Sequence, residues 1–116
     1  MSEQKASPPI QIHVSLDENR IPEQITWSAP GPEGESTSDA KAMLLSLFDR
    51  ETKDTLKIDL WTKDMQIAEM DRFFYQTIRA LADTYHKATS NTKLAESMQQ
   101  FATYFGEEAE IIPKGS

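Results

Sequence analysis

The sequence predicts an α+β fold in which four strands precede two helices. In two N-terminal segments, and again at 56–60, apolar residues alternate with polar ones, which is the period of a half-buried strand. From Ile67 to Ala88 the apolar spacing changes to the 3.6-residue period of a helix. Because only a short polar turn joins the last strand to this helix, we expect the sheet and the helix to pack on each other.

The first two strands are expected to form an antiparallel hairpin. Residues 10–16 alternate strictly between apolar and polar side chains. The sequence DENR at 17–20 predicts a turn, because Asp and Asn side chains bond to their own backbone. A second strand follows at 21–27, with Ile25 and Trp27 on one face. That phase places both side chains in the core.

The third and fourth strands are expected to form a second hairpin. Residues 30–39 are rich in Pro, Gly, Glu and Ser, which predicts a mobile surface loop. The apolar run that follows could be strand or helix by itself. The charged turn at 49–55 and the alternation after Leu56 favour a strand over about Ala42 to Phe48. Since this strand is apolar on both faces, we expect it to lie inside the sheet with both faces covered.

Two helices complete the predicted fold. Asp64 is a good N-cap for the helix that begins near Ile67, since its carboxylate can accept from the first free N–H groups. The polar residues at 89–92 end this helix and cap the next. The second helix has apolar residues at intervals of four, three and four between 94 and 105. Gly106 is expected to end it in a left-handed conformation.

These elements predict one domain over residues 10–106. Residues 1–9 are expected to be a disordered lead, and residues 107–116 an acidic tail. The strands form a four-stranded antiparallel meander of order β-β-β-β-α-α, and the two C-terminal helices pack on one of its faces.

Composition excludes several classes of function. The formal net charge is −7, which disfavours binding to nucleic acid and to anionic membranes, since both need clustered Lys and Arg. The chain has no cysteine, so disulfides, thiolate metal sites and cysteine catalysis are excluded. Its first residues lack the apolar segment of a secretory signal, and no apolar run approaches the length that spans a membrane. We therefore expect a soluble, cytoplasmic protein.

The sequence assigns no catalytic, cofactor-binding or metal-binding residue. His13 and His86 have no second nitrogen ligand at metal spacing. Caps, turns and solvated faces account for carboxylates such as Asp59 and Asp64. No cofactor is expected, and we expect no enzyme. A small carboxylate-dependent hydrolase is the least favoured alternative, because no nucleophile and base can be paired.

A protein-binding surface is the functional feature that the predicted fold suggests. Two helices can cover only one face of the sheet, and apolar surface left on the other face is rare in monomers. The candidates for this interface are Trp61, Met43, Leu45 and Leu47. Trp61 is out of phase with the apolar residues of its strand, so it either folds under the start of the helix or faces a partner. A homodimer, or a standing protein partner, is expected.

The segment LKIDLWTKDM at 56–65 resembles the gliding motility-associated protein GldC family of Bacteroidetes-type bacteria. Similar pieces occur in the first hairpin, at 16–27, and along the long helix, at 69–89. The likeness spans about Ile10 to Phe105. It implies a small soluble accessory protein of gliding motility, a machinery tied to the secretion of adhesins. The family offers no catalytic residues to transfer to this chain.

Two functions follow from the sequence. The first is a non-enzymatic accessory protein that acts by protein–protein interaction, with a partner in the gliding or secretion machinery. The alternative is a SecB-like export or holdase chaperone for unfolded clients, which rests only on the similar order of strands and helices. That alternative requires an exposed apolar groove.

Overall fold

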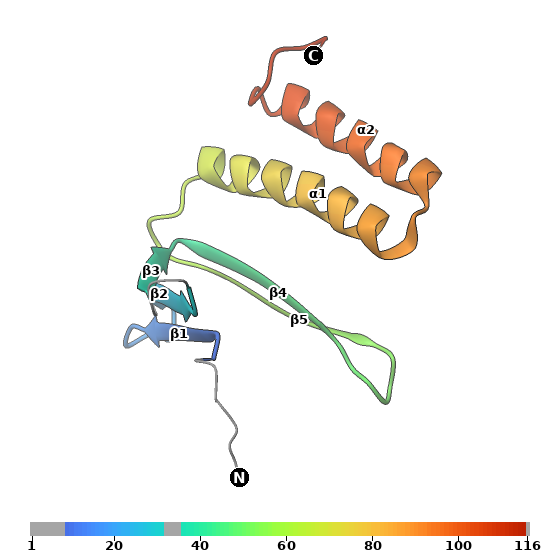
Figure 1. Ribbon diagram of the computed structural model, residues 1–116. Helices are drawn as coiled ribbons and strands as arrows, with labels where there is room; N and C mark the ends of the chain where they lie inside the picture. Colours follow the sequence, from blue (N-terminus) through green and yellow to red (C-terminus); the bar gives the residue numbers. More distant parts are fainter. Residues whose placement is uncertain (1–8, 32–35, 116) are drawn as a thin grey trace. The chain divides into compact units, whose positions relative to one another are not determined.

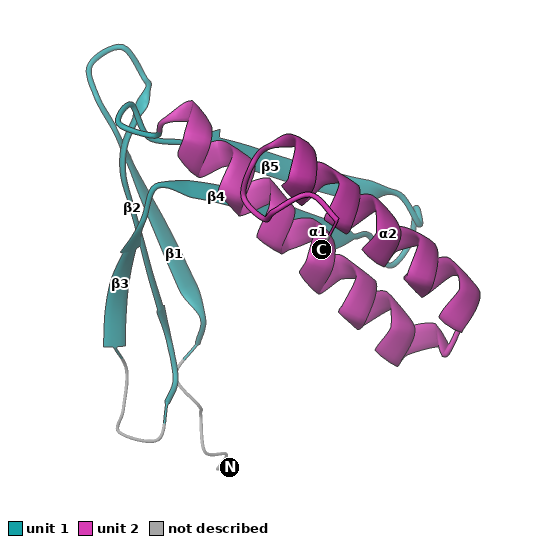
Figure 2. Ribbon diagram, turned by 90° about the horizontal axis from the view of Figure 1, so that it is seen from above, with its two compact units in different colours: residues 1–65 teal, residues 66–116 magenta. Residues whose placement is uncertain are grey.

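The computed structural model describes residues 9–31 and 36–115. The predictions for residues 1–8, and for the part of the loop at 32–35, lie outside the described residues. The chain divides into two units, Met1–Met65 and Gln66–Ser116, coloured teal and magenta in Figure 2. Each unit is described by itself below.

The first unit contains the strands (Figure 1). In the described residues these are β1 (Gln11–Leu16), β2 (Pro22–Ala29), β3 (Ser36–Ala40), β4 (Ala42–Phe48) and β5 (Thr55–Trp61). They form an antiparallel three-stranded sheet of order β1-β2-β3 and a separate antiparallel pair, β4-β5. The predicted α+β class, with strands before two helices, is confirmed. The prediction of one four-stranded sheet is wrong.

The strand β3 accounts for the divided sheet. Its sequence, STSDA, has no apolar alternation, so the predicted loop at 30–39 includes all of it except Ala40. It forms because β2 offers a free edge: Ile25 pairs with Ala40, and the pairing continues to Ala29. A bend at Lys41 then separates β3 from β4, and the Lys41 carbonyl accepts from the N–H of Thr62 at 2.8 Å. The chain thus leaves the first sheet and starts the β4-β5 pair.

Burial in the three-stranded sheet is uneven. Ile25 lies opposite Val14 and Ala40 and is only 1 % exposed. Trp27, on the same face, is 42 % exposed, so its prediction as a core residue is wrong. Trp27 lies opposite Ser38 on β3, and a serine side chain is too small to cover an indole ring.

The strand β4 does not lie inside a sheet, contrary to the prediction. Among the described residues it pairs only with β5. Leu47 and Phe48, near its end, are 54 % and 68 % exposed. An apolar run predicts covered faces, but in this hairpin it leaves apolar side chains exposed.

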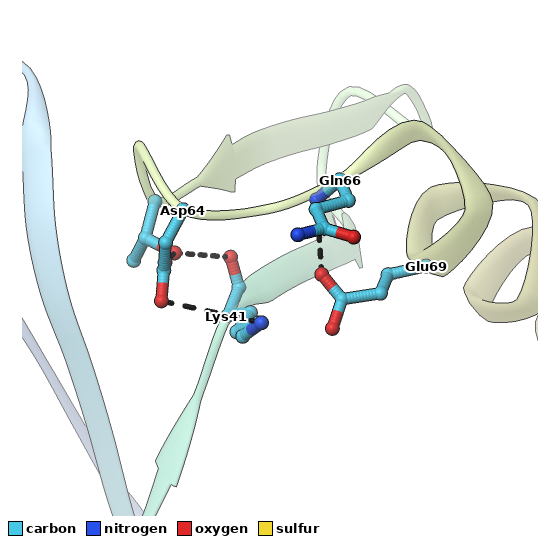
Figure 3. A network of polar contacts seen from close by, with 5 residues as sticks. Lys41, Asp64, Gln66 and Glu69 are labelled. Atoms are coloured by element: carbon cyan, nitrogen blue, oxygen red, sulfur yellow. Dashed lines mark hydrogen bonds and ion pairs between the residues drawn. The ribbon is translucent and has the colours of Figure 1, made fainter.

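The second unit is a pair of helices, α1 (Ile67–Thr89) and α2 (Thr92–Glu108). The N-cap of α1 is Gln66, whose N–H donates to the Glu69 carboxylate at 2.9 Å, one half of a capping box (Figure 3). The prediction that Asp64 caps this helix is therefore wrong. Asp64 instead accepts a hydrogen bond from the hydroxyl of Thr62.

The break between the helices is confirmed at its predicted place. Ser90 ends α1 in a left-handed conformation, with φ of 59°, and Asn91 caps α2 by accepting from the N–H of Leu94 at 3.1 Å. Gly106 does not end α2, contrary to the prediction, and two residues assigned to the acidic tail are helical. Gly106 is buried because the ring of Tyr75 fills the space that a Cβ atom would occupy.

A charged contact links two loops of the first unit. Lys63, after β5, donates to Asp17 in the β1–β2 turn, with Nζ and Oδ2 2.7 Å apart. The other carboxylate oxygen accepts from the backbone N–H groups of Ile21 and Asn19. The Lys63 hydrogen bond, supported by these N–H groups, lowers the pKa of Asp17 to about 2.

We expect this contact to make stability depend on pH in a defined direction. Because the pKa of Asp17 is lower in the folded state than its ordinary 3.8, its contribution is present above pH 3.8 and is lost as pH falls toward 2. Asp17→Asn should therefore lower stability at neutral pH, and its difference from wild type should shrink in acid. Urea unfolding between pH 7 and 2.5 measures this, with the exposed Glu18→Gln of the same turn as control. A difference that grows in acid would contradict it.

Candidate functional site

The register of the β4-β5 hairpin places six apolar side chains on one face. Met43 pairs with Leu60, Leu45 with Ile58, and Leu47 with Leu56. Side chains of directly paired residues lie on the same side of a sheet, and every second residue shares that side. We call this set the apolar hairpin face; its members are Met43, Leu45, Leu47, Leu56, Ile58 and Leu60.

The free end of the apolar hairpin face is strongly exposed. Leu47, Leu56 and Ile58 are 54 %, 59 % and 49 % exposed. The other three members are intermediate in burial. Contiguous exposed leucine and isoleucine on a sheet is the feature that distinguishes an interaction surface from scattered surface apolar residues.

The structure brings together only three of the four predicted interface residues. Met43, Leu45 and Leu47 belong to the apolar hairpin face, whereas Trp61 pairs with Ala42 and lies on the opposite side of the hairpin. Trp61 is 56 % exposed. Leu56 and Ile58 were not among the predicted interface residues. Their alternation was visible, but only the cross-strand register shows which β4 residues they join.

A polar cluster that includes Lys41 and Asp64 holds the base of the hairpin (Figure 3). Thr62 is 4 % exposed, and its hydroxyl lies 3.2 Å from the Lys41 carbonyl oxygen and donates to Asp64. The Lys41 ammonium lies 4.0 Å from the Asp64 carboxylate. The hydrogen bond from Thr62, followed by the charge of Lys41, lowers the pKa of Asp64. The cluster closes the open end of the β4-β5 ladder.

The far end of the hairpin is held by its turn. The Asp49 carboxylate accepts from the N–H groups of Thr52, at 2.8 Å, and Glu51, at 3.1 Å. These two bonds lower the pKa of Asp49. Lys53 adopts φ of 63°, which the chain needs to return into β5. Both ends of the hairpin are therefore fixed by local polar bonds, independently of its apolar side chains.

The helical unit has an apolar surface of its own. Small residues are buried where α1 and α2 pack, namely Ala82, Ala95, Ala102 and Gly106. Larger side chains are left beside them and form a groove of about 540 Å³. The groove is lined by Ile78, Tyr85, Leu94, Ser97, Met98 and Phe101. Leu94 and Phe101 are about half exposed.

The side chains considered for chemistry belong to different strands and helices. His13, on β1, pairs with Thr26, and His86 lies 3.1 Å from the Thr92 hydroxyl in the second unit. Asp59 is bonded to Lys57 at 3.1 Å. Over residues 9–31 and 36–115, no three His, Cys, Asp or Glu side chains gather as a metal site would require.

The comparisons with known proteins identify one family. The family model described as GldC-like, gliding motility-associated protein GldC-like, matches residues 22–111. No curated protein and no solved structure matches the chain. Neither helix in the described part of the chain has the length and apolar character needed to cross a membrane.

Proposed function

The chain belongs to the GldC-like family of gliding motility-associated proteins, and we propose that it is a non-enzymatic accessory protein whose apolar hairpin face binds another protein. The gliding machinery, or the secretion machinery tied to it, is the proposed source of that partner. The observation that carries the proposal is the register of β4 and β5, which gathers the exposed Leu47, Leu56 and Ile58 on one side.

The energetics of this surface favour association. Fully burying one Leu or Ile side chain contributes roughly 1.5–3 kcal/mol. Covering three such side chains that are about half exposed therefore supplies on the order of 3 kcal/mol. The hairpin backbone is already fixed by the Asp49 turn and the Thr62 cluster, so binding need not order it. Apolar residues on a preformed surface are typical of interface centres.

Leu47→Asp tests the proposal, with Ser46→Asp as its matched control. The two residues are adjacent on β4, both are exposed, and they face opposite sides of the hairpin. We expect Leu47→Asp, introduced at the chromosomal locus of a gliding host, to abolish colony spreading and the specific capture of a partner. Ser46→Asp should leave both unchanged. An immunoblot checks that both variants reach wild-type abundance, and normal spreading by abundant Leu47→Asp protein would overturn the proposal.

The groove of the helical unit supports the second candidate, a SecB-like holdase. It supplies the exposed apolar surface that such a function requires, and the flexible Met98 can adapt to varied clients. Suppression of the aggregation of heat-unfolded citrate synthase at equal molar ratio would favour this candidate. Absence of suppression would count against it.

A further inference from the structure

One edge of the β4-β5 hairpin carries the pattern needed to pair with a copy of itself. At the two ends of the hairpin, backbone bonds join Thr62 to Lys41, at 2.8 Å, and Asp49 to Asp54, at 2.9 Å. Hydrogen-bonded pairs alternate with non-bonded pairs along an antiparallel ladder. The N–H and C=O groups of residues 56, 58 and 60 therefore point toward β4. Those of residues 55, 57, 59 and 61 point away from it.

In the part of the chain that the structure describes, the outward groups of β5 meet no other strand. Among the described residues, β5 pairs only with β4. An open strand edge is a template for another strand, unless charges or bulges block it. This edge carries two charges, Lys57 and Asp59, and no proline. Because they are opposite in sign and two residues apart, their effect depends on the register in which a second strand arrives.

A two-fold axis through Ile58 makes these charges complementary. When β5 pairs antiparallel with a copy of itself about this residue, Lys57 lies opposite the partner's Asp59, and Asp59 opposite the partner's Lys57. Lys57 and Asp59 both point their backbone N–H and C=O groups away from β4. The two copies can therefore form ladder hydrogen bonds at these same two residues. Shifting the axis by one residue places Lys57 against Lys57, or Asp59 against Asp59, and like charges directly opposite destabilise a sheet.

The net charge of the hairpin also permits self-association. The whole chain carries a formal charge of −7, which opposes the approach of two copies. Residues 41–64 carry five Lys or Arg and five Asp or Glu, so this segment is neutral. Pairing through β5 thus brings the copies together at a segment without net repulsion.

We propose that the chain forms a two-fold symmetric homodimer through antiparallel pairing of β5 with β5, centred on Ile58. The product is a four-stranded sheet of order β4-β5-β5-β4. The pairing would extend a two-stranded sheet of the described residues into four strands, and additional strands stabilise a sheet. It also joins the apolar hairpin faces of two copies into one surface. The proposal rests on the edge and its charges, and not on the proposed function.

Charge exchange tests the register. Sedimentation equilibrium should show a dimer for the wild-type chain. Lys57→Asp alone and Asp59→Lys alone each place two like-charged pairs across the axis, so each should weaken dimerisation at least about tenfold. The double variant Lys57→Asp/Asp59→Lys should restore the dimer, and so should an equimolar mixture of the two single variants. Lys53→Asp and Asp54→Lys, in the hairpin turn, make the same changes of net charge and should leave the dimer intact.

A cross-link locates the axis directly. The chain has no cysteine, so Ile58→Cys introduces one thiol at the position where the two copies meet. Mild oxidation should convert this variant into a covalent dimer, whereas Leu45→Cys, on β4, should remain uncross-linked. A monomeric wild-type chain, single charge variants that dimerise as wild type does, or failure of the double variant to recover would each overturn the proposal.

The same variants separate this inference from the proposed function. Lys57→Asp should lose the dimer, while the apolar hairpin face of each copy remains available to a partner. Leu47→Asp should lose the partner while keeping the β5 edge and the dimer. Failure of one prediction therefore leaves the other open to its own test.

Discussion

Replacing Ile25 with alanine is expected to cost about 2–4 kcal/mol of stability, which is typical of Ile→Ala at a fully buried site. Ile25 is 1 % exposed, and it is the largest fully buried side chain among the described residues. It lies on the central strand β2, between Val14 and Ala40, and neither neighbour can extend into the space that the lost atoms leave. Guanidinium unfolding at fixed protein concentration measures the loss.

Ile12→Ala is the matched control for this prediction. Ile12 lies on the same face of the three-stranded sheet, opposite Trp27, and is 41 % exposed. The same atoms are removed, but no closed cavity forms, so the cost should stay below about 1 kcal/mol. Equal losses of stability for Ile25→Ala and Ile12→Ala would contradict the prediction that burial of Ile25 sets the larger cost.

Gly106→Val should destabilise the helical unit by about 2–3 kcal/mol, because it overpacks a close contact between the helices. A Cβ atom at Gly106 would lie 2.6 Å from Cε1 and 2.8 Å from Cδ1 of Tyr75, and 3.1 Å from Cγ1 of Ile112. Tyr75 is 9 % exposed and its ring lies under the Arg79 guanidinium, so the ring has little room to move. Thermal unfolding followed by circular dichroism measures the effect.

Two variants distinguish overpacking from helix propensity. Gln100→Val puts the same β-branched residue at an exposed position of α2 and should cost less than about 1 kcal/mol. Combining Gly106→Ala with Tyr75→Leu should cost less than the sum of the two single changes, since the smaller side chain makes room for the new methyl group. Strict additivity of these two changes would rule out the contact between Tyr75 and Gly106 as the cause.

Local signals predicted much of this fold correctly. The strand at 42–48 and the hairpin that it forms with the next strand were expected from an apolar run, a charged turn and a period of two. The end of α1 and the start of α2 followed from the polar residues at 89–92. Each of these features depends on neighbours within about ten residues, so the sequence contains what is needed to predict them.

Competing partners explain the wrong predictions. Asp64 has the chemistry of an N-cap, but the Thr62 hydroxyl donates to it and α1 begins two residues later than that cap would imply. Gly106 has the chemistry of a helix end, but its missing side chain is used to admit Tyr75. In both cases a contact decided between two roles that the residue type allows equally.

The candidate interface was predictable in part. The excess of apolar residues in the third and fourth predicted strands pointed to Met43, Leu45, Leu47 and Trp61. Which of them share a surface depends on the cross-strand register of the hairpin. Because Trp61 pairs with Ala42, the Trp61 side chain lies on the face opposite Met43, Leu45 and Leu47. The family match over residues 22–111 agrees with the resemblance found in the sequence, and it does not by itself identify a binding surface.

By itself the sequence determined the α+β class, the family, most element positions and the presence of surplus apolar residues. Only the tertiary structure decided that β3 exists, that the strands divide at Lys41 into two sheets, and which side chains of β4 and β5 lie together. The reason is physical. Periodicity and capping depend on residues within one segment. A sequence as polar as STSDA has little intrinsic preference for a strand, so β3 forms only because β2 supplies its backbone hydrogen-bond partners.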